Sequence, residues 1–220
     1  MSNDNNKRHF HNITILVDND SWILPYANEL ADDLAIDHHC QLVRNADDIE
    51  TGDVCFLLGC TKIVAKELLA RNQYNLVVHE SELPQGKGFA PMSWQILAGK
   101  KSIPVCLISA SEQVDSGKIW LRDIIVLDGN ELHDQWRAKQ GDTTIKLAKK
   151  FVENYQELTA NEQVGQTSTY PRRSAKDSEL DINKTLAEQF NLLRVVSNKN
   201  YPAFFVKDGI KYKVEVSRDE

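Results

Sequence analysis

Short apolar runs separated by helix-like stretches constrain this chain more than any other feature of its sequence. Ile13–Val17, Val54–Leu58 and Leu76–Val78 each read as a buried strand, because each run is short, continuously apolar and bounded by polar residues. Buried strands that alternate with helical spacing are typical of a parallel sheet covered by helices on both faces. The sequence therefore predicts an α/β fold with a central, mostly parallel sheet.

Helical spacing predicts the elements between these strands. Ser21 is expected to cap a helix that continues to about Ile36, and Thr61 is expected to cap a second helix that contains Leu68 and Leu69. The remaining predicted elements are strands over 103–108 and 120–127 and helices over 92–98, 143–155 and 182–196.

The last third of the chain differs from the part before it, and we predict a boundary between domains at 1–156 and 157–220. Asp208-Gly209 lies between Ala203–Lys207 and Ile210–Val216, a pattern that predicts a β-hairpin. The tail is expected to be a small α+β subdomain that packs on the first domain, since about 60 residues make only a marginal core alone.

Charge and length exclude several classes of protein. The 220 residues have a formal net charge of −6, which disfavours a general binder of the nucleic-acid backbone. No stretch approaches the roughly 18 apolar residues of a membrane span, and the polar segment Met1–His11 does not resemble a signal peptide. We therefore expect a cytoplasmic protein that binds neither nucleic acid nor a membrane.

Cysteine and histidine usage argues against a metal centre. The four cysteines form no CxxC pair, and we expect reduced thiols without disulfides. His38-His39-Cys40 has the residue types of a metal site, but adjacent side chains in an extended segment point to opposite faces. We expect no metal.

The segment around His79 is the most unusual in the chain. His79 follows an apolar run and precedes a loop with Gly86-Lys87-Gly88, and Asp115 follows another apolar run. A histidine at a strand end can act as a general base, and a neighbouring carboxylate orients it and favours its charged form. Read singly, the two are a solvated loop histidine and a turn aspartate. Because ligands bind beyond the carboxyl ends of parallel strands, we predict that both lie at one rim of the sheet.

Arg172-Arg173 is a basic pair in an acidic protein. Its functional interpretation is contact with a phosphate, and its alternative is a solvated loop pair. Trp94, Trp120 and Trp136 are interpreted first as packing residues.

Several motifs in the chain occur in a distinctive order. They are Leu57-Leu58-Gly59-Cys60-Thr61-Lys62-Ile63, His79-Glu80-Ser81-Glu82-Leu83-Pro84, Gly86-Lys87-Gly88 with Pro91, Trp94 and Ile96, and Val114-Asp115-Ser116-Gly117-Lys118-Ile119. Together they resemble the formyltransferases that use N10-formyltetrahydrofolate, a family that includes glycinamide ribonucleotide, methionyl-tRNA and bacterial sugar N-formyltransferases. The tail is similar too, through Arg172-Arg173, Asp181-Ile182, Leu193-Arg194 and Tyr201-Pro202-Ala203-Phe204, and the subtype most resembled is the compact sugar enzyme of pseudaminic acid and related pathways.

The resemblance implies a Rossmann-like catalytic domain and a catalytic Asn, His and Asp. His79 and Asp115 match two of these positions, whereas Val77 stands where the family has Asn, and Asn75 has the wrong offset. The resemblance also implies that Asp18–Trp22 replaces a Gly-rich turn, so that the acceptor pocket is distinctive.

The resemblance further implies two groups of binding residues. Those expected at the formyl donor, N10-formyltetrahydrofolate, are Leu57, Leu58, Gly59, Cys60, Ser109, Ala110 and Val114. Those expected at the acceptor are Trp22, Gly86, Lys87, Gly88, Trp94, Arg172 and Arg173. The implied reaction is N-formylation of a nucleotide-linked amino sugar, with pseudaminic acid or surface-glycan synthesis as the implied pathway. The alternatives are another small amine, such as a purine-pathway intermediate, or a folate- or nucleotide-binding protein without activity. A homodimer through the C-terminal hairpin is a further expectation.

Overall fold

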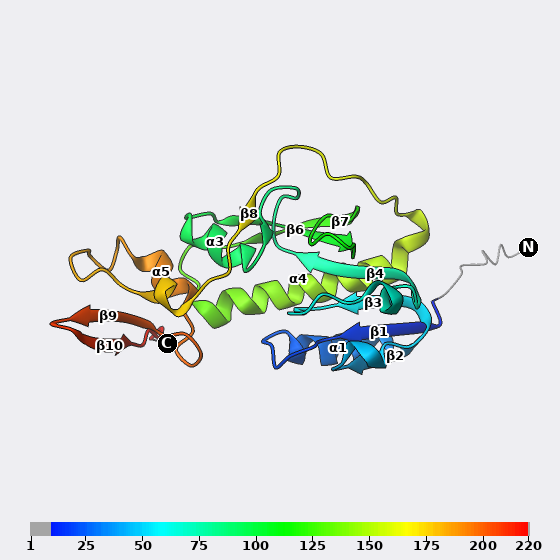
Figure 1. Cartoon of the computed structure of the whole chain (residues 1–220), viewed down its shortest axis with the longest axis horizontal. Coiled ribbons are helices and arrows are strands. Elements are labelled where there is room, and N and C mark those ends of the chain that lie inside the picture. Colours follow the sequence, from blue (N-terminus) through cyan, green and yellow to red (C-terminus); the bar gives the residue numbers. More distant parts are fainter. Residues whose placement is uncertain (1–9, 220) are drawn as a thin grey trace, which may run out of the picture.

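A six-stranded sheet forms the centre of the computed structural model, which describes residues 10–219 (Figure 1). Its strand order is β2-β1-β3-β4-β6-β7. The strands are β1 (Asn12–Leu16), β2 (His39–Val43), β3 (Gly52–Leu57), β4 (Asn72–His79), β6 (Ser102–Ser109) and β7 (Ile119–Val126). The helices are α1 (Leu24–Leu34), α2 (Lys66–Leu69), α3 (Pro91–Leu97), α4 (His133–Asn154) and α5 (Phe190–Val195).

The sheet is mostly parallel, and its antiparallel part begins beside β4. The pairings of β1 with β2, β1 with β3 and β3 with β4 are parallel. β6 pairs antiparallel with β4, and β7 antiparallel with β6. The α/β fold predicted from the apolar runs is confirmed, with two antiparallel strands at one edge.

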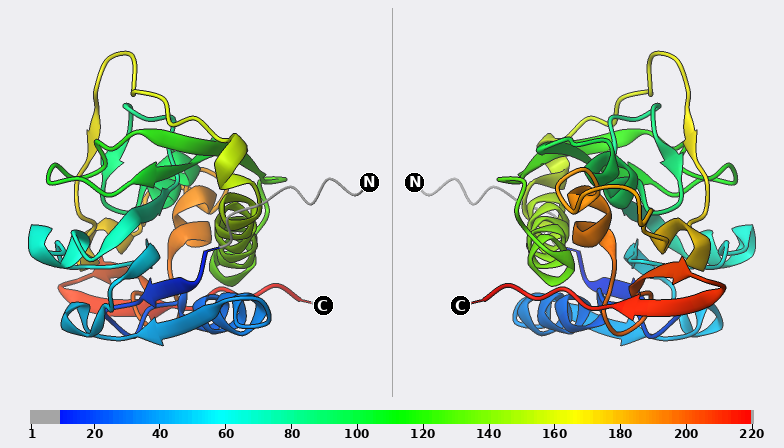
Figure 2. Two further views of the ribbon diagram at one scale, coloured as in Figure 1. Left: turned by 90° about the vertical axis from the view of Figure 1, so that its right-hand side faces the viewer. Right: turned by 90° about the vertical axis from the view of Figure 1, so that its left-hand side faces the viewer.

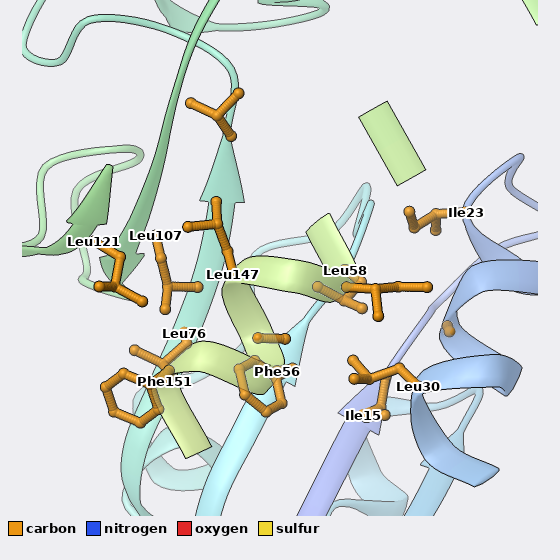
Figure 3. Close-up of a cluster of buried hydrophobic side chains, with 14 of the residues drawn as sticks. Ile15, Ile23, Leu30, Phe56, Leu58, Leu76, Leu107, Leu121, Leu147 and Phe151 are labelled. Atoms are coloured by element: carbon orange, nitrogen blue, oxygen red, sulfur yellow. The ribbon is translucent and has the colours of Figure 1, made fainter. Parts of the chain in front are cut away.

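Alternation along β4 sends neighbouring side chains to opposite faces of the sheet. Leu76 and Val78 pack into the larger core, whereas Val77 packs against smaller clusters on the other face. Helices α1 and α4 lie side by side over the larger core (Figure 2). Leu147 and Phe151 of α4 reach down to the sheet there, beside Phe56, Leu76 and Leu107 (Figure 3).

Strand β2 was not predicted. It lies at the edge of the sheet, and four of its five side chains are exposed or only half-buried. An edge strand of this kind needs no continuous apolar run, so apolar patterning does not reveal it.

The predicted starts of the first two helices are wrong. Ser21 does not cap α1 with its side chain; its carbonyl accepts the Leu24 N–H, and Pro25 occupies the first turn, where its missing N–H costs nothing. Thr61 does not cap α2, whose N-cap is Ala65; the Thr61 hydroxyl and the N–H groups of Thr61 and Lys62 are instead donated to the Asp18 carboxylate. α2 is correspondingly short and begins at Lys66.

Helix α4 begins at His133 rather than at about Thr143. The Gln135 side chain accepts the Leu132 N–H at its start. Gly141 lies inside the helix, where a Cβ would come within 2.5 Å of the Tyr26 ring. Close packing against α1 therefore requires a glycine at this position of the helix.

The helix predicted over 182–196 is also wrong, since α5 covers only its last turn and a half. Local side-chain hydrogen bonds hold the preceding residues in turns: Glu188 accepts the Thr185 N–H, and Asp181 accepts the Asn183 N–H. Such bonds give the backbone an alternative to the helix.

The tail packs against the rest of the molecule. Its hairpin, β9 (Ala203–Lys207) and β10 (Ile210–Val214), and α5 lie together at one end, beside the start of α4 (Figure 1). Trp136 of α4 donates its indole N–H to the Arg194 carbonyl over 2.9 Å. The hairpin prediction is confirmed, with positive φ at Asp208 and Gly209 as the two-residue turn requires. The boundary between 156 and 157 stays a prediction.

Candidate active site

His79 is the last residue of β4, and its side chain is enclosed. The residue is 5% exposed, and its Nε2 lies 2.8 Å from the Gly86 carbonyl oxygen. Its Nδ1 lies 3.5 Å from Asp115 Oδ1. Because a carbonyl oxygen only accepts, Nε2 carries a proton in this arrangement. His79 is therefore held at both ring nitrogens.

Asp115 comes to His79 by a different route from the one predicted. β6 runs antiparallel to β4, so the two do not share a carboxyl rim. The loop after β6 turns back instead, with Asp115 in the left-handed region at φ 52°. Its Oδ2 accepts the Gly88 N–H over 2.8 Å. The predicted proximity of the two side chains is confirmed, and the reason given for it is wrong.

The segment that covers His79 is itself held down by a strap from the tail. β5 (Lys87–Gly88) pairs with β8 (Thr169–Tyr170). A Cβ on Gly86 would lie 2.7 Å from the Tyr170 ring, and one on Gly88 would lie 2.5 Å from the Tyr170 backbone carbonyl oxygen. Close approach of this strap explains both glycines.

Two more of the predicted acceptor residues contact the same region. Trp94 stacks on Tyr170, with ring centroids 6.3 Å apart, and donates its indole N–H to the Pro171 carbonyl. Lys87 Nζ donates to Ser116 Oγ over 2.7 Å. Both side chains therefore link the loop to its surroundings in this structure.

Val77 lies on the same face as His79, two residues before it. Its side chain packs against the apolar clusters of Leu57 and of Cys106. Asn75 does not replace the missing amide, because its Nδ2 donates to the carbonyl oxygens of Leu69 and Asn72. Its Oδ1 is buried and has no hydrogen-bond partner.

The structure divides the residues predicted to bind the formyl donor. Leu57, Cys60 and Ala110 pack in one cluster on the Val77 face. Ser109 Oγ accepts the Trp120 indole N–H, and Val114 is 53% exposed. Leu58 and Gly59 lie elsewhere, in the wall of a large cavity on the α4 side of the sheet.

That cavity has a volume of about 920 Å³, within the range of ligand sites. Val78 and Glu80, on either side of His79, line it, but His79 and Asp115 do not. Of the predicted acceptor residues, Trp22, Arg172 and Arg173 line it. The predicted site is thus brought together as two groups, on opposite faces of β4.

The loop that replaces the expected Gly-rich turn forms one rim of the cavity. Asp18 accepts the N–H groups of Thr61 and Lys62. Partial burial by itself would raise the pKa of the Asp18 carboxyl, but hydrogen bonds from Asn19, Thr61 and Lys62 outweigh it and lower that pKa. Asp18 therefore joins the ends of β1 and β3 as a carboxylate.

Sequence reasoning did not single out Arg137, Gln140 and Glu80, which line the cavity. The Arg137 guanidinium lies between two indoles, 4.5 Å from the Trp22 ring centre and 4.3 Å from that of Trp136. Its Nη1 donates to Gln140 Oε1, and Gln140 Nε2 donates to Glu80 Oε1. Placing the start of α4 at His133 would have put Arg137 and Gln140 on one helix face.

Thiols and histidines of the described residues form no metal centre. Burial raises the pKa of the Cys55 and Cys60 thiols to about 12, and all four cysteines are free. Between residues 10 and 219, no group of three or more His, Cys, Asp or Glu side chains is arranged to hold a metal ion. A search of the same residues also finds no helix with the length and apolarity needed to span a membrane.

Comparison with solved structures identifies the fold. Methionyl-tRNA formyltransferase from Clostridium thermocellum superposes with a TM-score of 0.80 at 17% identity, over 96% of this chain and 94% of that one. A sugar N-formyltransferase from a Shewanella species superposes with a TM-score of 0.73 at 15% identity, over 96% and 98%. HypX from Aquifex aeolicus, solved with tetrahydrofolic acid, superposes with a TM-score of 0.76 at 14% identity, over 95% and 38%. At these identities, the shared property is the fold.

Sequence comparison identifies the family. Methionyl-tRNA formyltransferase from a Sulfurihydrogenibium species is 25% identical over 161 residues, which are 70% of this chain and 50% of that protein. The chain thus spans about half the length of the curated relative it matches. The model of the formyl transferase family matches residues 37–152, more than half of the chain. The chain belongs to the formyl transferase family.

Proposed function

We propose that this protein is an N-formyltransferase that moves a formyl group from N10-formyltetrahydrofolate to the amine of a nucleotide-linked amino sugar. The observation that carries the proposal is the contact of His79 with Asp115, 3.5 Å apart at the end of β4, in a chain of the formyl transferase family. A role in pseudaminic acid or surface-polysaccharide synthesis is the corresponding pathway proposal. A homodimer and a cytoplasmic location remain predictions.

The hydrogen bonds of His79 define what the pair can do with a proton. Since Nε2–H donates to Gly86, a neutral ring would present the lone pair of Nδ1 to Asp115. That contact is attractive only if a proton lies between the two groups, on either His79 or Asp115. With that proton present, the pair can donate a hydrogen bond to negative charge that develops on the formyl oxygen; without it, the pair can accept the proton that the amine loses.

Access to His79 requires a local movement. The Gly86 carbonyl occupies Nε2, and the strap from Tyr170 holds the Gly86–Gly88 segment in place. An acceptor amine can reach Nε2 only when this segment shifts. The mechanism therefore couples acceptor binding to opening of the β5–β8 pair.

The residues on the Val77 face fit a pterin ring. Leu57, Cys60 and Ala110 provide an apolar surface. Beside them, the buried Asn75 Oδ1 is an acceptor without a partner, which an N–H group of the pterin would satisfy. The donor supplies the formyl group; the chain supplies this surface, the acceptor atom and the His79–Asp115 pair.

The choice of an amino sugar rests on charge and on the cavity. The net charge of −6 gives little attraction for a tRNA backbone. The fold does not separate the two acceptors, because the Clostridium thermocellum methionyl-tRNA enzyme and the Shewanella sugar enzyme both match over nearly their whole length. Trp22, Arg172 and Arg173, in the wall of the large cavity, are proposed to face the acceptor.

A second candidate function follows from Val77. An apolar side chain at the position of the family's Asn, next to an enclosed His79, favours a folate- or nucleotide-binding protein that no longer transfers a formyl group. Another small amine, such as a purine-pathway intermediate, is the remaining alternative acceptor.

The test is incubation of the full chain with N10-formyltetrahydrofolate and a panel of nucleotide-linked amino sugars, read by mass spectrometry for addition of one formyl group. We expect one member of the panel to be formylated by the wild type. A Val77→Asn variant runs in parallel: transfer that appears only in this variant establishes the binding protein instead. Formylation of methionyl-tRNA or of a purine-pathway amine, with no sugar formylated, would reject the sugar acceptor.

A further inference from the structure

Two arginines that line the cavity have a buried donor without a hydrogen-bond partner in the described part of the chain. The Nε atoms of Arg137 and Arg173 are buried and have no hydrogen-bond partner. Among residues 10–219, neither guanidinium forms an ion pair with a carboxylate. Leaving a buried charge without a partner is costly, so each group has unused capacity for an anion.

Other contacts fix the two side chains, both of which line the cavity. The two indoles hold Arg137 from both sides, and one Nη1 hydrogen bond goes to Gln140. Arg173 donates from Nη2 to the Asp177 carbonyl over 3.0 Å and from Nη1 to the Val195 carbonyl over 3.5 Å. An arginine has five N–H donors in a planar fork, so most donors of both groups remain. Fixed guanidinium groups suit bidentate recognition of oxyanions.

Charge in the cavity runs opposite to that of the whole chain. Its wall contains five Lys or Arg side chains and two carboxylates, in a protein of net charge −6. Both carboxylates are already engaged, Asp20 with Arg44 and Glu80 with Gln140. Burial lowers the pKa of Arg137 to about 10, and it also lowers the pKa of Arg173. Both groups remain protonated at neutral pH, and a bound anion would reverse these shifts.

We infer that Arg137 and Arg173 form an oxyanion subsite for a phosphate or diphosphate group of the acceptor. This inference rests on the proposed function only in calling the ligand an acceptor. It assigns the phosphate contact to Arg137 and Arg173, which are distant in sequence, in place of the adjacent pair Arg172-Arg173. Arg172 lies instead over the Phe89 ring, at 5.4 Å, and is exposed. A diphosphate suits the site because it presents several oxygens to two forks at once.

The rest of the cavity fits a nucleotide attached to that group. Aromatic residues line the wall beyond the two arginines: Phe89, Tyr201 and Phe204. Flat aromatic side chains can stack on any of the nucleotide bases. The volume of about 920 Å³ accommodates a ligand larger than inorganic phosphate. A nucleoside diphosphate would contact both the arginines and these aromatic side chains, whereas a small anion would contact the arginines alone. The subsite is therefore expected to bind the nucleotide more tightly.

The inference is tested by calorimetric titration of the full chain without any formyl donor or amine. The probes are inorganic pyrophosphate, the diphosphates of uridine, thymidine and guanosine, and succinate as a dicarboxylate. We expect one binding site for pyrophosphate and tighter binding of at least one nucleotide. Arg137→Gln and Arg173→Gln should each weaken both by about tenfold or more, the scale of one lost charge-assisted contact. Arg137→Lys should restore only part of the affinity, because it keeps the charge and loses the fork.

Arg122→Gln is the matched control, since Arg122 is an exposed arginine on β7 that pairs with Glu82. Thermal unfolding of every variant verifies that it is folded. Absence of pyrophosphate and nucleotide binding by the wild type, equal weakening in Arg122→Gln, or tighter binding of succinate would each overturn the subsite. Because no formyl transfer is measured, failure of the proposed activity leaves this result intact, and rejection of the subsite does not by itself reject the proposed activity.

Discussion

Two groups of charged side chains lie near the start of α4, and they differ in how their charges are paired. At the junction of α4 with α5, Arg194 is 1% exposed; its Nη2 lies 3.3 Å from Glu131 Oε2, and its Nε donates to the Glu131 carbonyl. Lys139 binds the other carboxylate oxygen at 2.6 Å. In the cavity, Arg137 and Arg173 have no such partner. Paired charges hold the tail to the core, whereas unpaired ones are available to a ligand.

The contact of His79 with Asp115 resembles the junction more than the cavity. It is enclosed, and each polar atom that we can place has a partner: Gly86 for Nε2 and Gly88 for Asp115 Oδ2. Yet it lies one residue from the cavity wall, at Glu80. The molecule thus separates the enclosed His79–Asp115 pair from the open cavity with its proposed anion-binding arginines, and the predictions below probe that separation.

The largest expected effect is on the junction. Glu131→Gln leaves Arg194 buried without a counter-charge, and we expect the free energy of unfolding to fall by about 3–5 kcal/mol. Urea denaturation measures it. Glu153→Gln, on an exposed position of the same helix, is the control and should change stability by less than about 0.5 kcal/mol. Equal effects of the two variants would show that the ion pair does not hold the tail.

Next comes the closed pair. If the proposed activity holds, His79→Ala and Asp115→Asn should each lower turnover at least about 10²-fold, or roughly 2.7 kcal/mol, with donor and acceptor saturating. His39→Ala, on the exposed edge strand, should leave turnover unchanged. Full turnover in both site variants would place the chemistry elsewhere, in the cavity itself.

A smaller effect is expected on the stability at low pH. Burial alone would raise the pKa of Glu131, but the bonds from Lys139 and from the Asp128 and Gly129 N–H groups outweigh it and lower that pKa. Its stabilising contribution is therefore present above the unfolded value of 4.5 and is lost as pH falls toward the folded value. Between pH 4.5 and 3.5, the wild type should lose about 1 kcal/mol more than Glu131→Gln. Parallel pH profiles for the two proteins would contradict this assignment.

The smallest effect is expected in the cavity. Arg137→Gln removes an unpaired charge together with its contacts to two indoles, and these changes oppose each other. We expect the free energy of unfolding to change by less than about 1 kcal/mol. If Arg137→Gln lowers the free energy of unfolding as much as Glu131→Gln does, then paired and unpaired charges do not differ in their contribution to stability.

The core strands could be predicted from sequence because burial on both faces leaves a local signature. The apolar runs Ile13–Val17 and Val54–Leu58 match β1 and β3 to within two residues. The edge strand β2 lacks that signature, because its side chains are mostly half-buried or exposed. The local pattern of apolar residues therefore indicates the fold class but does not reveal the edge strand.

The site was predictable only where a motif specifies it. His79 and Asp115 were identified from their motifs, and the structure confirms that they meet. Arg137 belongs to no motif. Only the structure shows that its guanidinium stacks on Trp22, bonds to Gln140 and has a buried Nε without a partner among residues 10–219. No spacing along the chain shows an unsatisfied donor.

The sequence by itself determined the alternation of strands and helices, the Asp208-Gly209 turn and the residues of the His79 motif, since each depends on neighbours within a few positions. Only the tertiary structure decided that β6 runs antiparallel and that Asp115 reaches His79 from a loop that turns back. It also decided which arginines are paired: Arg194 meets Glu131 across 63 positions of the chain, and Arg137 forms no ion pair with a carboxylate between residues 10 and 219. Pairing of buried charges depends on which segments pack together, and that is a property of the folded chain.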